Sequence, residues 1–380
     1  MKRQMKLLIV VNVDWAFITH RLPIAEEAVN KGWKVYVAAK DTGRAKDINN
    51  KIEFINFEFS RSGTNPIKEL YSFVKFLRLY RRIKPDVIHH VTLKPVIYGS
   101  FAARLTRIRG VLNAISGLGY TFTGEMKGVK GLISKIMVSL MRFGFNSEKM
   151  AFVFQNNDDY EELEKLNVFS KKNSFHFIKG VGVNLDEFKF SPIPNNDKTN
   201  ISIVTRMLWD KGIAELKKAS EILKVKYYKK ITFTLVGIAD EDNKAGVSEK
   251  FLKDWEDGEY VKWIGYQTNV VKIYSESDIV TLPSYREGIP RALIEACSIG
   301  RPIVTTNAIG CRECVDEGIN GFKVPIKSCS ELAEAFVKLI EDKELQRQMG
   351  KASRIKAEKE FDVEDVKKKH LTIYESLCNE

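Results

Sequence analysis

DIVTLPSYREGIPRALIEACSIGRPIVTT, residues 278–306, is the stretch from which the fold can be inferred. A short β-branched run ends at Leu282, a polar turn follows, and Pro290 opens a helical segment that stops near Gly300, before a second β-branched run. Strand, turn, helix and strand in this order are typical of a β-α-β unit, whose strands are parallel in one sheet.

The same alternation continues outward from this unit over most of the chain. Because short apolar runs alternate with helical patterns, the sequence predicts an α/β fold with two doubly wound β/α/β (Rossmann-like) domains facing a cleft. The predicted strands are residues 6–13, 33–39, 87–91 and 111–115 in the first half, and 201–206, 231–237, 260–265, 278–283, 302–306 and 321–325 in the second.

A change of amino-acid composition near residue 190 marks the predicted domain boundary. FSPIPNNDKTN, at 190–200, has two prolines, three asparagines and no apolar period, as expected of a linker. We therefore predict an N-terminal domain over 1–190 and a C-terminal domain over 191–361. The last helical stretch, 362–380, has few hydrophobic positions, so we expect it to pack outside its own domain, against the N-terminal one.

Composition excludes several classes of protein. With 44% hydrophobic and 29% charged residues over 380 positions, the chain is globular rather than disordered or fibrous. No apolar run reaches the roughly 18 to 20 residues of a membrane span, and Asn12 and Asp14 interrupt the first strand before it could serve as a secretory signal. Five cysteines are too few for a disulfide framework, so we expect a cytoplasmic protein.

The positive charge is concentrated in the first half of the chain. Residues 1–190 hold 31 Lys and Arg against 18 Asp and Glu, whereas residues 191–380 hold 30 against 31. Within the first half, residues 61–150 carry 16 basic and 4 acidic side chains. Such a field attracts an anionic lipid surface, a polyanion or a phosphate-bearing substrate, although a solubilising surface is the simpler alternative.

Candidate ligand-binding groups follow the strand that ends at Leu282. The backbone amides of Gly288 and Ile289, next to Pro290, would form an anion site at a helix start. Glu287 in the loop and Glu295 in the helix could both accept hydrogen bonds from sugar hydroxyls. Alternatively, Glu287 is a helix-start charge and Glu295 a solvated helix residue.

A second group of candidates ends the strand at 201–206. Arg206 follows the strand, and Lys211 precedes Gly212 at the start of a helix. One planar guanidinium and one ammonium at such a place suit a diphosphate, although basic residues are common in loops.

Taken together, these motifs resemble a known enzyme family. Arg206 and Lys211, followed by SYREGIPRALIEA and GCRECVDEGINGF, are similar to the nucleotide-sugar domain of the GT-B retaining glycosyltransferases of family 4. The first half resembles the same branch in FITHRLPI, HVTLKP, GLGYTF and FQNNDD. We associate these features with bacterial enzymes that act on undecaprenyl-diphosphate-linked saccharides in O-antigen, capsule or N-glycan assembly.

The resemblance implies a role for each second-half motif. Arg206 and Lys211 would bind the donor diphosphate and stabilise the charge that develops on the leaving nucleotide. Glu287 would contact hydroxyls of the transferred sugar, and Glu295 the ribose. The amides of Gly288 and Ile289 would complete the phosphate site of a C-terminal nucleotide-sugar domain, with the base against the loops after 236–238 and 263–266.

The resemblance also implies a reaction. The family transfers a sugar with retention and without a divalent metal, while a donor phosphate oxygen takes the acceptor proton. For this chain we expect a UDP-sugar as the donor and no cofactor. We expect an N-acetylhexosamine as the sugar and a polyprenyl-diphosphate-linked saccharide as the acceptor. The enzyme would then act at the cytoplasmic face of the cell membrane, with the N-terminal domain facing acceptor and membrane.

The acceptor side shows one departure from the family. Many members place a histidine after the strand that corresponds to 111–115, but this chain has Ser116-Gly117-Leu118-Gly119 there. Backbone groups of Gly117 or Gly119 would have to replace it. His20 and Arg21 are further candidates for acceptor contact, although a packed histidine at a helix start fits His20 equally well.

The stretch 128–145 is predicted to be an amphipathic helix. Leu132, Ile136 and Leu140 fall on one side, and Lys130 and Arg142 off it. Such a helix can lie in a membrane interface, but an ordinary core-facing helix shows the same stripe.

Other signals and functions are less well supported. Cys311-x2-Cys314 lacks the second pair or histidine of a zinc site, and Asp240-Glu241-Asp242 fits a solvated loop better than a metal signature. A nucleotide-sugar epimerase would need an acid/base pair that we do not find. A non-catalytic polyanion-binding protein is disfavoured because the basic residues do not form a nucleic-acid module, so we expect no nucleic-acid partner.

Overall fold

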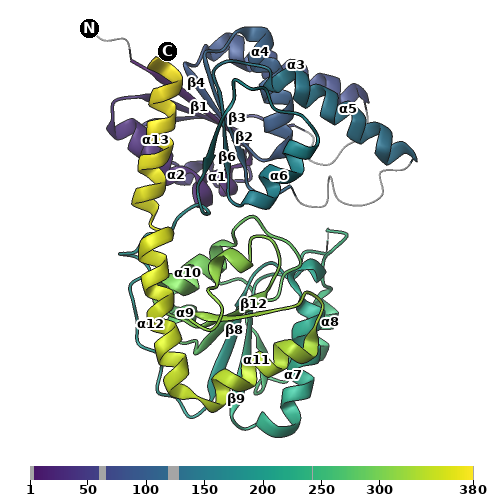
Figure 1. Ribbon diagram of the computed structural model, residues 1–380, viewed down its shortest axis with the longest axis vertical. Helices are drawn as coiled ribbons and strands as arrows, with labels where there is room; N and C mark the ends of the chain where they lie inside the picture. The colour runs from purple at the N-terminus through teal and green to yellow at the C-terminus, as the bar shows by residue number, and fades with distance from the viewer. Residues whose placement is uncertain (1–3, 60–65, 119–127, 242, 380) are drawn as a thin grey trace. The chain divides into compact units, whose positions relative to one another are not determined.

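The chain forms two units, each built on its own parallel β-sheet, in a computed structural model that describes residues 4–59, 66–118, 128–241 and 243–379 (Figure 1). Unit 1 comprises Met1–Val181 and Glu364–Glu380, and unit 2 comprises Gly182–Val363. Unit 1 thus contains the two ends of the chain, and unit 2 is one continuous segment.

The sheet of unit 1 has seven parallel strands in its described part, in the order β3-β2-β1-β4-β5-β6-β7. Leu7 of the central strand lies opposite Val35 on one side and Val87 on the other. The order changes direction between β1 and β4, as in a doubly wound sheet. The strands are β1 (Lys6–Val13), β2 (Lys34–Lys40), β3 (Ile52–Asn56), β4 (Val87–Val91), β5 (Gly110–Ile115), β6 (Met150–Phe154) and β7 (Ser174–Phe177).

Helices cover both faces of this sheet. On one face, three helices form a layer joined by ring contacts, tilted between Phe73 and Phe101 and edge-to-face between Phe101 and Phe143. On the other face, Phe17, Ala25 and Tyr374 pack on the strands. The helices are α1 (Asp14–His20), α2 (Leu22–Asn30), α3 (Pro66–Ile83), a π-helical turn (Pro95–Gly99), α4 (Ser100–Thr106), α5 (Gly128–Phe145), α6 (Asn157–Lys165) and α13 (Val363–Asn379).

Helix α13 is fixed to the sheet of unit 1 by a buried polar cluster. The hydroxyl of Tyr374 and Nδ1 of His89 in β4 are 2.6 Å apart, and the rings of His89 and His370 stack at 5.5 Å. All three side chains are buried. The helix, drawn in yellow in Figure 1, runs along the sheet that contains the start of the chain.

Unit 2 repeats the architecture with six parallel strands among its described residues, in the order β10-β9-β8-β11-β12-β13. The order changes direction between β8 and β11, so the loops after these two strands lie at the topological switch point of the sheet. The strands are β8 (Thr199–Val204), β9 (Ile231–Val236), β10 (Val261–Trp263), β11 (Ile279–Leu282), β12 (Ile303–Thr306) and β13 (Gly321–Val324).

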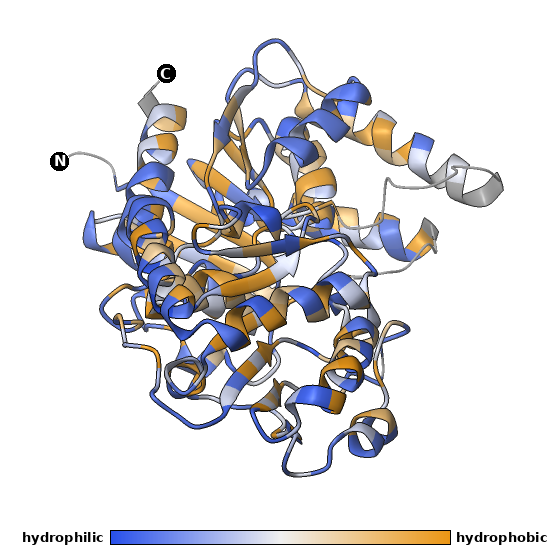
Figure 2. Cartoon of the chain, turned by 60° about the horizontal axis from the view of Figure 1, so that its bottom comes forward, coloured by the Kyte–Doolittle hydropathy of each residue, from blue (hydrophilic) through white to orange (hydrophobic). Residues whose placement is uncertain are grey.

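The helices of unit 2 bury one face each, except α10, which is buried from Leu293 to Ile299. Figure 2 shows the strands as mainly hydrophobic and the helices as mixed, the pattern expected when helices cover a sheet. The helices are α7 (Ile213–Tyr227), α8 (Glu249–Trp255), α9 (Val270–Ser275), α10 (Arg291–Ile299), α11 (Cys329–Glu341) and α12 (Lys343–Glu360), with 3-10 turns at Trp209–Lys211 and Arg312–Cys314.

The prediction of two doubly wound Rossmann-like sheets is confirmed, with small corrections. Three strands, the edge strands β3 and β7 and the inner strand β6, were not predicted, and the helix expected at 95–105 is a π-helical turn followed by α4. Pro290 is the N-cap residue of α10 in an extended conformation, so the helix begins at Arg291 instead. Among the described helices, none has the length and apolar character needed to cross a bilayer.

Candidate active site

The loops after β8 and β11 are held together at the carboxyl edge of the unit 2 sheet. Gly212 has a φ of +76°, and a Cβ atom at this position would lie 2.1 Å from the carbonyl oxygen of Pro283, so only glycine permits the approach. The amide of Tyr285 donates to the carbonyl of Asp210 at 2.9 Å. This contact sets the position of Lys211 relative to the β11 loop.

Lys211 and Glu287 form an ion pair between these two loops, through Nζ and Oε1. Their side chains are only 14% and 16% exposed, so their attraction is screened less by water than that of a surface pair. The hydroxyl of Ser284, which is fully buried, lies 2.9 Å from the same Oε1. The fold therefore brings together Lys211 and Glu287, which were predicted as site residues, and Ser284, which was not.

The backbone beneath Glu287 is equally constrained. Its amide donates to the carbonyl of Ile309 at 2.9 Å. Gly310 has a φ of +85°, and a Cβ there would lie 1.9 Å from the carbonyl oxygen of Gly288. Gly288 is half-buried and Ile289 is buried in the core, directly before Pro290. Their predicted role as an anion site stays a prediction.

Glu295 is a buried residue of α10, not the solvated helix residue that was the alternative. One carboxylate oxygen accepts from Nε of Arg291 at 2.6 Å, and the other accepts from the Tyr274 hydroxyl at 3.2 Å. Burial raises the pKa of Glu295, and Arg291 opposes that shift. No contact joins it to Glu287 among the described residues, and its role toward a ribose stays a prediction.

Arg206 lies on the β8 loop but contacts a different partner from Lys211. Its guanidinium is 3.2 Å from Asp240, on the loop after β9, and its side chain is 49% exposed. Gly237 allows this loop to approach β8, since a Cβ there would lie 1.8 Å from the carbonyl oxygen of Thr205. Arg206 is thus held in a partly exposed ion pair, and its role toward a diphosphate stays a prediction.

The predicted acceptor residues lie in unit 1. His20 ends α1 and is half-buried, whereas Arg21 is 3% exposed and donates from Nη1 to the His20 carbonyl at 2.9 Å. Burial lowers the pKa of Arg21 to about 10. Gly117 follows β5 with a φ of +107°, and Gly119 lies outside the described residues.

Two polar contacts at the carboxyl edge of the unit 1 sheet were not predicted. Thr92 has a φ of +73° and donates from its hydroxyl to Asn12 at 2.9 Å, joining the ends of β4 and β1. Lys94 and Glu69 form a largely buried ion pair at 2.8 Å. The signal was present in the HVTLKP motif, which directly follows the predicted strand 87–91.

Three of the four cysteines of unit 2 belong to its core. Cys297, Cys311 and Cys314 are free thiols, all fully buried, and burial raises the pKa of each. In the part of the chain that the structure describes, no group of three or more His, Cys, Asp or Glu side chains could hold a metal ion.

Comparison with solved structures assigns the fold to a class of enzymes. Anabaena Alr3699/HepE, solved in complex with UDP and glucose, superposes with a TM-score of 0.77 at 19% identity, covering 98% of this chain and all of that one. The two Rossmann-like parallel sheets of this chain thus have the GT-B fold.

Comparison of sequences then identifies the family. Residues 6–156 match the glycosyl transferase 4-like family and residues 185–356 match the glycosyl transferases group 1. The chain belongs to these glycosyltransferases.

Two relatives are similar over most of the chain. The N,N'-diacetylbacillosaminyl-diphospho-undecaprenol alpha-1,3-N-acetylgalactosaminyltransferase of Campylobacter jejuni is 28% identical over 94% of this chain and 95% of its own length. The UDP-Gal:alpha-D-GlcNAc-diphosphoundecaprenol alpha-1,3-galactosyltransferase of Escherichia coli is 25% identical over 73% and 72%.

Proposed function

We propose that this glycosyltransferase moves an N-acetylhexosamine from a UDP-sugar to a polyprenyl-diphosphate-linked saccharide, with retention and without a metal. The observation that carries the proposal is the Lys211–Glu287 pair at the switch point of the unit 2 sheet. The relatives from Campylobacter jejuni and Escherichia coli, whose names specify a diphospho-undecaprenol acceptor, support the choice of acceptor. The first of them supports an N-acetylhexosamine as the transferred sugar.

The ion pair suggests how one site would bind both the diphosphate and the sugar of the donor. The diphosphate, with its negative charges, would replace Glu287 as the partner of the Lys211 ammonium. Glu287 would then be free to accept hydrogen bonds from the sugar hydroxyls, while Ser284 keeps its carboxylate in place. Arg206, which is exposed, would turn from Asp240 to the diphosphate, and Glu295 would accept from the ribose.

The transfer step needs no protein nucleophile. The bond between the anomeric carbon and the phosphate oxygen breaks as the acceptor hydroxyl oxygen bonds to that carbon on the same face. The hydroxyl proton passes to the departing phosphate oxygen. Lys211 and Arg206 stabilise the charge on that diphosphate as the bond breaks, which is the main contribution this chain makes to the rate.

Unit 1 would bind the acceptor, through His20 and the backbone near Gly117 and Gly119, and would sit on the membrane. Apolar side chains are exposed on three neighbouring helices: Ile67 and Leu70 of α3, Leu105 of α4, and Ile136 of α5. The same helices carry many of the basic residues of 61–150. Each basic residue near an anionic bilayer contributes about 1 kcal/mol, so this surface would hold the enzyme at the cytoplasmic face of the cell membrane.

Helix α5 supports this assignment only in part. Met141 is fully buried, and Met137 and Leu140 pack against the core, so much of its apolar stripe faces the sheet. Leu132 lies among the residues whose side chains the structure does not describe. The exposed Ile136 and the start of α3 therefore provide the apolar contact in the proposal.

The test is a transfer assay with radiolabelled UDP-N-acetylhexosamines and a synthetic undecaprenyl-diphosphate saccharide. Because Lys211 stabilises charge that develops in the transition state, Lys211→Ala should lower kcat by about 10²- to 10³-fold. Glu287→Gln should reduce turnover as well, since an amide accepts hydroxyl hydrogen bonds less strongly than a carboxylate. The product's anomeric configuration, read by nuclear magnetic resonance, tests retention.

Lys217→Ala is a matched control, because Lys217 also forms an ion pair with a glutamate in unit 2, on the surface of α7. It should leave the rate unchanged. Full activity of both site variants would refute the site. Conversion of the UDP-sugar without any acceptor would point instead to an epimerase.

A further inference from the structure

A groove lies between the edge strand β7 and α13, within unit 1 and outside the proposed acceptor residues. Its volume is about 670 Å³, within the range of ligand-binding sites. One wall is the strand segment Phe175 to Ile178. The other wall is one face of α13, whose residues recur every three or four positions along the helix. That face comprises Asp365, Lys368, Lys369, Thr372, Ile373 and Ser376.

The strand wall offers unpaired backbone groups. The amide of Ile178 donates to Phe154 of β6, and bonding residues alternate along a parallel ladder. Phe175 and Phe177 therefore turn their N–H and C=O groups away from β6, toward the open edge of the sheet. Among the described residues, no hydrogen bond uses these groups.

Nothing in the sequence of β7 blocks pairing at this edge. Native proteins commonly protect edge strands with a charged residue or a proline in the strand, but β7 reads Ser-Phe-His-Phe. Phe177 is also 47% exposed, on the side of the strand opposite α13. One side of the edge thus presents the exposed ring of Phe177, and the other faces the polar and charged side chains of α13.

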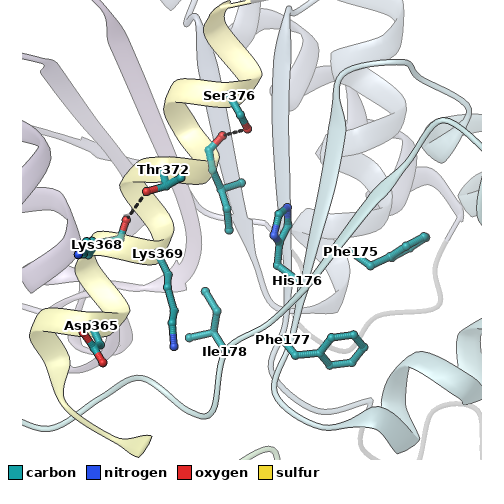
Figure 3. A pocket seen from close by; sticks show the side chains of 10 residues that line it. Phe175, His176, Phe177, Ile178, Asp365, Lys368, Lys369, Thr372 and Ser376 are labelled. Atoms are coloured by element: carbon teal, nitrogen blue, oxygen red, sulfur yellow. Dashed lines mark hydrogen bonds between the residues drawn. The ribbon is translucent and has the colours of Figure 1, made fainter. Parts of the chain in front are cut away.

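The helix wall supplies positive charge without an internal partner. Figure 3 shows Lys369 extending from α13 toward Ile178, on the side of the strand where His176 projects, with Phe175 and Phe177 turned the other way. Lys368 and Lys369 form no ion pair with any described residue, and Asp365 is the one carboxylate in the lining. A ligand that pairs with β7 would meet the Lys369 ammonium on its α13 side, and Lys368 adds a second positive charge to the same lining.

We propose that β7 is a docking edge for an extended segment of a partner protein in which acidic and apolar residues alternate. The segment would add a strand to the sheet through the backbone groups of Phe175 and Phe177. Successive side chains of a strand point to opposite faces, so its acidic residues would face Lys368 and Lys369. Its apolar residues would cover Phe177 on the other face.

Charge complementarity disfavours a second copy of this chain as the occupant. If two β7 edges paired, each copy would bring the same two lysines to one interface, and like charges across an interface weaken association. An acidic segment instead neutralises both. This inference goes beyond the transfer reaction and does not depend on it.

Binding of a fluorescein-labelled peptide of alternating glutamate and valine, seven residues long, to the full-length protein tests the proposal by fluorescence anisotropy. We expect saturable binding that weakens as salt is added, because part of the attraction is electrostatic. The double variant Lys368→Glu/Lys369→Glu should weaken binding about tenfold or more, since attraction becomes repulsion. A peptide N-methylated at alternate backbone nitrogens should not bind, because it cannot complete the ladder.

Lys250→Glu/Lys351→Glu is the matched control, since it makes the same change of charge at exposed residues of unit 2 and should bind as the wild type does. Thermal unfolding of each variant shows whether its fold is retained. The proposal is overturned if the wild type does not bind the peptide, if the N-methylated peptide binds equally well, or if the Lys368/Lys369 variant binds normally. It is also overturned if the protein forms dimers through this edge. The same holds if binding to anionic vesicles depends on these lysines and binding to the peptide does not.

Discussion

At the scale of single residues, Ser284 is the side chain that links the geometry of the site to its chemistry. It is fully buried, and its one hydroxyl proton can be donated to Glu287 at 2.9 Å or to the Asp210 carbonyl at 3.0 Å. Hydrogen bonds to charged groups contribute about 1.5 to 3 kcal/mol. Ser284 therefore positions Glu287, which in turn pairs with Lys211.

Ser284→Ala should lower kcat about 10- to 100-fold, because Glu287 would lose its fixed orientation. Ser284→Thr should recover part of that rate, since the hydroxyl is restored. Steady-state kinetics of both variants measure this, with thermal unfolding as the check on the fold. Equal rates for Ser284→Ala and the wild type would show that Ser284 has no positioning role.

Gly212 gives a second prediction at this scale, because the protein contains a matched control. Gly212 and Gly258 have nearly the same φ, +76° and +75°, but a Cβ meets Pro283 at Gly212 and nothing within 4 Å at Gly258. Left-handed backbone alone costs a non-glycine residue about 1 to 2 kcal/mol. Gly212→Ala should reduce the free energy of unfolding by more than Gly258→Ala, and only Gly212→Ala should also lower activity. Denaturant unfolding measures both, and equal losses would contradict the close approach.

At the scale of elements, helix α13 depends on histidines that are buried without charge. Burial lowers the pKa of His370 to about 3, and that of His89 well below its usual value, with Arg21 adding to both shifts. The unfolded chain binds these protons near pH 6.5, whereas the folded protein does not. The contribution of these two histidines to the free energy of unfolding is therefore fully present above about pH 6.5 and is lost progressively as the pH falls toward 3.

The free energy of unfolding should decrease by about 1.4 kcal/mol per pH unit for each such histidine below pH 6. His370→Phe should reduce this slope by about 1.4 kcal/mol per pH unit, the effect of one bound proton, because it removes one group that titrates only in the unfolded state. Guanidinium unfolding at pH 7.5, 6 and 5 measures the slope. An unchanged slope in the variant would mean that His370 is already protonated in the folded protein.

Element by element, the fold was largely predictable from periodicity, and the exceptions have physical reasons. The helices predicted at 66–83 and 128–145 have those bounds in the structure, because long amphipathic patterns are strong signals. Strands β3 and β7 were missed since edge strands are short and half-exposed, and so lack a continuous apolar run. Strand β6 was missed for a different reason: it is a fully buried apolar run of only five residues, which periodicity alone does not distinguish from a buried helical segment.

The candidate site was predictable in its members but not in its contacts. Lys211 and Glu287 are 76 residues apart, and no local pattern shows that they meet. Nor could the sequence show that Glu295 is buried beside Tyr274, or that Arg21 is covered by a helix roughly 350 residues further along the chain. Such contacts depend on how the sheets bring distant loops together.

At the scale of the whole molecule, the uneven charge is the feature that bears on location. The basic excess lies in residues 61–150, which include the exposed apolar side chains of α3. The proposed membrane association should therefore combine an electrostatic and an apolar contribution, of which only the first is screened by salt.

Binding to vesicles with anionic lipid should weaken as salt rises from 50 to 500 mM. Ile67→Asp/Leu70→Asp should weaken it at every salt concentration, since both side chains, 79% and 64% exposed, would contact the bilayer. Val225→Asp is the control, because Val225 is 92% exposed but lies in unit 2. Sedimentation with vesicles measures binding, and equal sedimentation of all three proteins would exclude this surface.

Helix α13 has a further consequence for the order in which a ribosome can produce a finished molecule. The first sheet emerges early, but the helix that covers His89 and Arg21 is translated only after the whole of unit 2. Unit 2, being continuous, can fold as soon as it emerges, whereas in unit 1 α1 and α2 cover only part of one sheet face until α13 is made. The nascent first half is therefore the stage at which this protein is most exposed to aggregation and most in need of a chaperone.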